Sequence, residues 1–107
     1  MVAELEQLVL LALLRLGPEA YGVAIAEEIE TRAGRRASLG SVYKTLIRLE
    51  TKRLVTTRLG EPTPERGGRR KRFYQLTPAG QMALQGSLEA IRRMTSGLRE
   101  VRLGEQR

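Results

Sequence analysis

Residues 38–53, SLGSVYKTLIRLETKR, combine a helix start, an apolar stripe and a row of hydrogen-bond donors. Ser38 is a favourable N-cap for a helix that runs from Leu39 to about Arg53. Its inward face is expected to carry the apolar side chains that recur every three or four residues, Leu39, Val42, Leu46 and Leu49. A second face is expected to carry five donors, three of them cationic, at Ser41, Lys44, Thr45, Arg48 and Lys52.

Two helices are expected before this one. Residues 2–16 are apolar on nearly all sides of a helix, which ends at Gly17-Pro18. Because so short a chain has few elements to cover such a helix, it indicates a partner subunit. A second helix is expected over residues 21–33, with Gly34 as its stop.

Two β-prone segments follow the central helix, residues 54–59 (LVTTRL) and 72–76 (RFYQL). The segment between them, GEPTPERGGRRK, is too long for a tight hairpin turn, so we expect a strand, a long basic turn and a strand. Taken alone, the glycines and arginines of this turn are also compatible with a flexible linker or an RNA-binding tail.

A last helix is expected to open at Thr77-Pro78, where Thr caps and Pro suits the first helical position, and to run to about Leu103. Its apolar stripe is expected to pack against its own domain, a second copy, or both. Met82 and Met94 are interpreted as core residues. The residues expected at a dimer contact are Leu84, Leu88, Ile91 and Leu98.

Positive charge is concentrated in the middle of the chain. The 107 residues carry 19 Lys and Arg against 12 Glu, a formal net charge of +7. Residues 32–72 alone have a net charge of +10, whereas residues 1–31 have a net charge of −5. Such segregation is typical of a protein that binds a polyanion, although a basic surface kept for solubility is the simpler alternative.

Several residue types are missing altogether, namely Asp, Asn, His, Cys and Trp. This composition excludes zinc fingers, iron–sulfur clusters, thiolate catalysis and Ser–His–Asp triads, so we expect neither an enzyme nor a metal or cofactor site. The longest apolar run, residues 8–14, is far below the roughly 20 residues of a membrane span. We expect a cytoplasmic protein without a membrane partner.

The order of helices, strands and basic turn predicts a mainly α fold with a small β-hairpin. We expect a winged helix-turn-helix domain over residues 1–77 and a C-terminal dimerisation helix and tail over residues 78–107. Gly40 and Ser41 leave room for close approach to the major groove of DNA, where Lys44 can reach bases or phosphates. The expected DNA contacts are Ser38, Gly40, Ser41, Tyr43, Lys44, Thr45 and Arg48 on the helix, and Arg69, Arg70 and Lys71 on the wing.

Tyr43 has two interpretations. Its ring either packs beneath the helix or places its hydroxyl on a phosphate, and we favour the second. The donor-rich face itself, taken alone, is also compatible with a solvated surface. The combination of this face with a basic hairpin at short range in the chain favours nucleic acid.

Three segments together resemble the PadR family of transcriptional regulators, over about residues 5–85. They are YGVAIAEEIE (residues 21–30), SLGSVYKTLIRLE (38–50) and LVTTRLGEPTPERGGRRKRFYQLTPAG (54–80). The resemblance implies a winged helix-turn-helix, a homodimer through the C-terminal helix and repression at palindromic operators. It also implies that the wing lies at residues 69–71 and that the helix residues facing DNA are Ser38, Gly40, Ser41, Tyr43 and Lys44.

Because only one helix is expected in its C-terminal part, the chain resembles the short subclass of that family. Some short members bind flat aromatic drugs between stacked tryptophans, a mode that cannot be carried over to a chain without Trp. A small-molecule effector is compatible with the sequence, which identifies none.

The sequence therefore predicts a sequence-specific DNA-binding transcriptional regulator, a homodimeric repressor of an inverted-repeat operator in double-stranded DNA. Two alternatives stay open. One is a winged-helix module whose basic face binds an acidic protein. The other is an RNA binder. The chain has only four aromatic side chains, which are few for stacking against the bases of a single strand, so this alternative is disfavoured.

Overall fold

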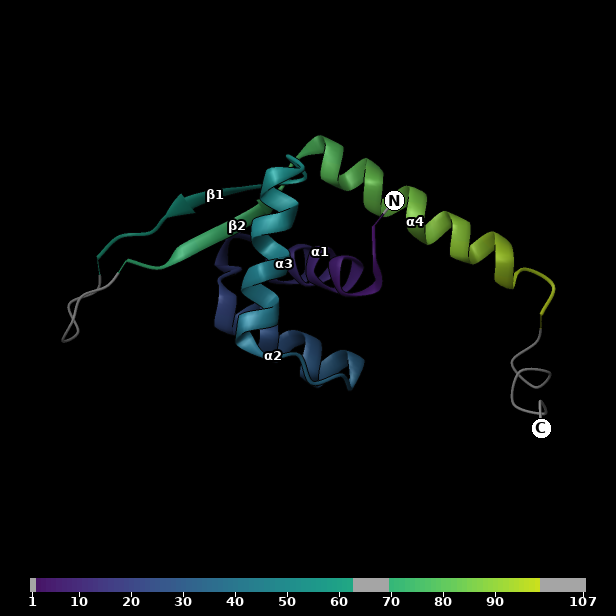
Figure 1. Cartoon of the computed structure of the whole chain (residues 1–107), viewed down its shortest axis with the longest axis horizontal. Coiled ribbons are helices and arrows are strands. Elements are labelled where there is room, and N and C mark those ends of the chain that lie inside the picture. Colours follow the sequence, from purple (N-terminus) through teal and green to yellow (C-terminus); the bar gives the residue numbers. More distant parts are fainter. Residues whose placement is uncertain (1, 63–69, 99–107) are drawn as a thin grey trace.

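The computed structural model describes residues 2–62 and 70–98. Figure 1 shows the helices α1 to α3 packed together, with the hairpin projecting from one side and α4 from the other. The elements in chain order are α1 (Glu4–Leu16), the short 3-10 helix η1 (Gly17–Glu19), α2 (Gly22–Ala33), α3 (Leu39–Thr51), β1 (Val55–Leu59), β2 (Arg72–Leu76) and α4 (Pro78–Thr95). This architecture confirms the predicted mainly α fold with a small β-hairpin.

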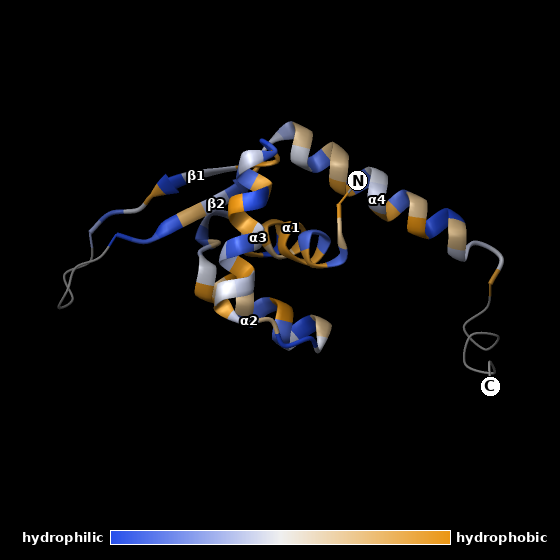
Figure 2. Cartoon of the chain, viewed as in Figure 1, coloured by the Kyte–Doolittle hydropathy of each residue, from blue (hydrophilic) through white to orange (hydrophobic). Residues whose placement is uncertain are grey.

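One apolar core joins the helices to the hairpin. Figure 2 shows α1 as a largely apolar helix, and it lies at the centre of this core. Burying apolar side chains from α1 to α4 and from both strands stabilises the arrangement, because each removes its surface from water. The buried residues include Val9, Leu10, Leu13, Ile25, Ile29, Val42, Leu46, Leu49, Val55, Tyr74 and Leu84.

Side-chain caps set where the helices begin. Ser38 Oγ accepts a hydrogen bond from the Ser41 N–H at 3.1 Å, as its N-cap prediction requires. Thr77 Oγ1 accepts one from the Gly80 N–H at 3.0 Å, directly before Pro78. At α1 the Glu6 carboxylate accepts a 2.9 Å bond from the Ala3 N–H, so this helix begins at Glu4 rather than at Val2.

Helix α3 ends slightly earlier than predicted, at Thr51. Arg53 then takes a φ of 62°, a left-handed conformation that turns the chain, and the Leu54 N–H bonds to the Leu49 carbonyl at 2.9 Å. This turn directs the chain from α3 into the hairpin.

The hairpin is antiparallel and is attached to the segment that precedes α2. Its register pairs Val55 with Leu76 and Leu59 with Arg72. The Tyr74 N–H donates to the Ala20 carbonyl at 2.9 Å, and the rings of Tyr21 and Phe73 meet edge to face at 5.9 Å. These contacts fix the base of the hairpin relative to α2 and α3. Residues 63–69, which include the predicted wing residue Arg69, lie outside the described residues.

Helix α4 ends at Thr95, not near Leu103 as the apolar spacing predicted. Ser96 is extended and Gly97 has a φ of 84°, so the helical path stops there. Residues 99–107 lie outside the described residues. The interpretation of Met82 and Met94 as core residues is wrong for the single chain, since they are 72% and 79% exposed.

Candidate nucleic-acid interface

The exposed face of α3 collects most of the residues that were predicted to contact DNA. Val42, Leu46 and Leu49 turn into the core. At about 100° per residue, the opposite side of the helix is exposed. It carries Gly40, Tyr43, Lys44, Ile47 and Arg48, with Ser38 and Ser41 exposed at the start of the helix.

Thr45 does not belong to this face, so its prediction as a DNA contact is wrong. Its side chain is fully buried, and its hydroxyl donates to the Ser41 carbonyl at 2.8 Å. The reason is geometric, because at about 100° per residue Thr45 lies only about 40° around the helix from Leu49, at the edge of the inward side. Leu39, predicted to point inward, is 42% exposed in the first turn.

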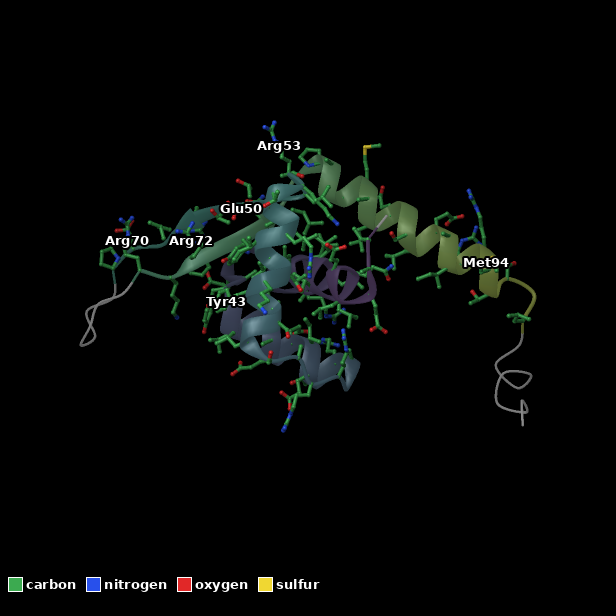
Figure 3. The ribbon with its side chains drawn as sticks, viewed as in Figure 1. Tyr43, Glu50, Arg53, Arg70, Arg72 and Met94 are labelled. Atoms are coloured by element: carbon green, nitrogen blue, oxygen red, sulfur yellow. The ribbon has the colours of Figure 1, made fainter. Side chains whose placement is uncertain are left out.

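The Tyr43 ring packs against α2, whereas a contact between its hydroxyl and a phosphate stays a prediction. The ring covers Gly22 in the first turn of α2, where an added Cβ would lie 2.4 Å from the Tyr43 hydroxyl oxygen. A side chain at residue 22 would therefore force the Tyr43 ring to move from its place over α2. The Tyr43 side chain is still exposed and lies on the face of α3 shown in Figure 3.

A buried carboxylate behind α3 was not anticipated from the sequence. The Glu6 side chain is 4% exposed, and its Oε2 lies 3.0 Å from Lys52 Nζ and 3.6 Å from Arg48 Nε. Both cations thus tie α3 to α1. The available sequence signal was an acid at the third position of a helix made mostly of apolar residues.

Burial raises the pKa of Glu6, but the surrounding donors reverse that effect. The hydrogen bond from the Ala3 N–H, the hydrogen bond from Lys52 and the positive charges of Lys52 and Arg48 together hold the pKa below its ordinary value of 4.5. Glu6 is therefore ionised at neutral pH.

Cations of the hairpin lie beside the exposed face of α3. Figure 3 shows Arg70 and Arg72 on the hairpin, on the side of the molecule opposite Met94 at the end of α4. Arg70 Nε donates to the Gly60 carbonyl at 2.8 Å, and Arg72 donates to Thr57 Oγ1 at 3.1 Å. Lys71 Nζ lies 4.3 Å from the centre of the Tyr21 ring.

A cleft of about 470 Å³ separates α3 from the hairpin. We call it the α3–wing cleft. It places hydroxyl groups, three cations and one carboxylate around one concave surface, and the excess of positive charge suits an anionic strand. Its lining residues are Tyr21, Tyr43, Ile47, Glu50, Arg70, Lys71, Arg72 and Tyr74.

An apolar stripe on α4 extends beyond the core of the chain. Leu84, predicted as a dimer contact, is 2% exposed and belongs to the core of its own chain, which corrects that assignment. Leu88 and Ile91 continue the same helix face and are 38% and 49% exposed. Leu98, beyond the end of the helix, is also exposed.

Two other features are absent from residues 2–62 and 70–98, a cluster of metal ligands and a membrane-spanning helix. Within these ranges no three acidic side chains are close enough to hold a metal ion. In the same part of the chain no helix has the length and apolar character needed to cross a bilayer.

Comparisons with known proteins agree with this geometry. The model of the transcriptional regulator PadR-like family matches residues 10–86. A PadR family transcription regulator from hypervirulent Clostridium difficile R20291 is similar in structure, with a TM-score of 0.71 and 26% identity over 87% of this chain and 92% of that one. Bacillus subtilis PadR in complex with operator DNA has a TM-score of 0.64 and 25% identity, over 77% of this chain and 45% of that one.

A curated relative is the uncharacterized 37.1 kDa protein in transposon TN4556 of Streptomyces fradiae. It is 38% identical over 89 residues, which make up 83% of this chain. The match spans 24% of that protein, so the chain corresponds to about a quarter of its length.

Proposed function

Because the chain belongs to the PadR-like family of transcriptional regulators, we propose that it binds operator DNA as a homodimer and represses transcription. Membership of this family makes the chain a regulator and not an enzyme. The observation that carries the proposal is the exposed, donor-bearing face of α3 beside the cationic hairpin.

The first half of α3 suits the major groove. The nearest atom to a Cβ built at Gly40 is Ser38 Oγ, 4.0 Å away, so nothing blocks close approach of the helix. Lys44 lies one turn further along the exposed face and can reach base edges or phosphates. Ser38, Ser41 and the free N–H groups of the helix start can bind a phosphate between them.

The hairpin suits the adjacent backbone or minor groove. Arg70, Lys71 and Arg72 are exposed and line the α3–wing cleft across from Tyr43. A strand of DNA that leaves the major groove beside α3 would cross these cations. The similarity to Bacillus subtilis PadR, whose structure is a complex with operator DNA, supports DNA as the partner.

The proposed dimer uses α4 together with α1. Leu88 and Ile91 extend a stripe whose first member, Leu84, is already in the core. Leu14 of α1 is 50% exposed, and with Leu8 and Leu11 it forms the apolar part of the lining of a groove beside α2. A second copy would cover these surfaces, with residues 78–107 as the pairing segment and residues 1–77 as the DNA-binding domain. Twofold pairing would set the two α3 helices about 34 Å apart, one turn of DNA.

Duplex titration with single-charge variants tests the interface. Lys44→Ala should weaken binding about ten-fold or more, since it removes a groove contact. Arg93→Ala is the matched control, because it removes the same charge from an exposed position on α4. Both variants should unfold at the wild-type temperature.

The salt dependence of the same titration tests the electrostatic part. Wild-type affinity should fall steeply between low and moderate salt as phosphate contacts release counterions. The proposal would be contradicted if both variants lost the same affinity for duplex DNA, or if the affinity did not change with salt. It would also be contradicted if single-stranded RNA or an acidic peptide competed for the protein more strongly than duplex DNA does.

A further inference from the structure

Ile47 is the most exposed large aliphatic side chain on α3, at 63%. It lies three residues after Lys44, four after Tyr43 and seven after Gly40, so all four occupy one side of the helix. Isolated apolar residues are common on protein surfaces. This one is informative because it sits in the middle of a face that otherwise offers donors, and because it lines the α3–wing cleft.

The core does not use this side chain. Val42, Leu46 and Leu49 are fully buried and fill the opposite side of α3. The exposed apolar stripe proposed for dimer contact lies on α4, which projects away from the hairpin side of α3 (Figure 1). Neither packing within the chain nor pairing through α4 therefore accounts for an isoleucine at this place.

We propose that Ile47 reads the 5-methyl group of a thymine in the major groove, an inference that rests on the proposed function. Among the four bases, thymine alone presents an apolar group at that groove. Isoleucine is branched at Cβ and held in one preferred rotamer in a helix, so its methyl groups project in a fixed direction. Lys44 supplies charge to the same groove, while Ile47 supplies discrimination between thymine and cytosine.

Replacing thymine by uracil removes only the methyl group and so isolates this contact. The probes are duplexes that the wild-type chain selects from a random library, with each thymine changed to uracil in turn. At one position in each half-site, wild-type affinity should fall about four-fold, the effect of burying one methyl-sized group.

The Ile47→Ala variant should bind the thymine and uracil forms of that position equally while keeping its sensitivity elsewhere. Alanine is a strong helix former, and an exposed side chain is removed, so the variant should unfold at the wild-type temperature. Thr51→Ala, one turn further along the same exposed side, is the control and should retain the discrimination.

Two failures can be told apart. If duplexes are selected but the uracil effect is the same in wild type and Ile47→Ala at every position, the role of Ile47 is overturned and the proposed function stands. If no duplex is enriched, the proposed function itself is overturned.

Discussion

Glu6 links α1 to α3, the helix that is proposed to enter the major groove. From its place on α1, its carboxylate binds Arg48 of α3 and Lys52, the residue that follows α3. Glu6→Gln should lower the free energy of unfolding at pH 7 by about 1–3 kcal/mol, because charge-assisted hydrogen bonds to a buried group are weakened. Urea unfolding measures this change, and Glu27→Gln, at an exposed position on α2, is the control that should change little.

The pH dependence of that difference follows from the lowered pKa of Glu6. A carboxylate with a depressed pKa in the folded state contributes stability that is complete above its unfolded value and is lost as the pH falls through the folded value. The gap between wild type and Glu6→Gln should thus stay constant from about pH 7 to pH 5 and shrink below the ordinary value of 4.5. An undiminished gap at about pH 3 would contradict this role.

Residue spacing alone placed Lys44 and Arg48 on an exposed face, but it also placed Thr45 there. The boundary between the two faces depends on where α1 and α2 pack, and that information is not local to α3. Ile47 was overlooked because it is apolar, although its spacing from Gly40 and Lys44 put it on the side of the helix opposite Val42 and Leu49. The partners of Glu6 lie 42 and 46 residues away in the sequence, so no local pattern could identify them.

Two glycines of α4 should respond oppositely to alanine. A Cβ at Gly80 would lie 2.0 Å from the Leu54 carbonyl oxygen, a backbone atom that cannot move aside. Gly80→Ala should therefore destabilise the fold by about 1–3 kcal/mol. At Gly86 a Cβ would meet nothing within 4 Å, so Gly86→Ala should stabilise by about 1 kcal/mol through helix propensity. The thermal unfolding temperatures of both variants test this prediction. If the two temperatures shift in the same direction, the close packing of α4 against Leu54 is refuted.

Elements with sharp local signals were predicted well. The strand over residues 72–76 has the predicted bounds, and the Thr77-Pro78 cap begins α4 as expected. The end of α4 was predicted wrongly because the apolar spacing continues through Leu98 and beyond. Periodicity reports which side chains could share a face, whereas the backbone at Ser96 and Gly97 sets where the helix stops.

The molecule as a whole has an apolar surface that a second copy is proposed to cover. Wild type should sediment as a particle of twice the 12.0 kDa chain mass. The double variant Leu88→Glu with Ile91→Glu should sediment as a single chain, since buried unpaired carboxylates would oppose pairing. Met82→Glu, on the opposite side of α4, is the control and should remain paired. A wild-type particle of one chain mass would rule out the dimer.

Selection of bound duplexes from a random library is the most direct test that paired α3 helices recognise DNA. We predict that the enriched sequences share an inverted repeat whose half-site centres lie about 10 base pairs apart, one turn of the double helix. Failure to enrich any sequence, or enrichment of a single site without twofold symmetry, would contradict the account.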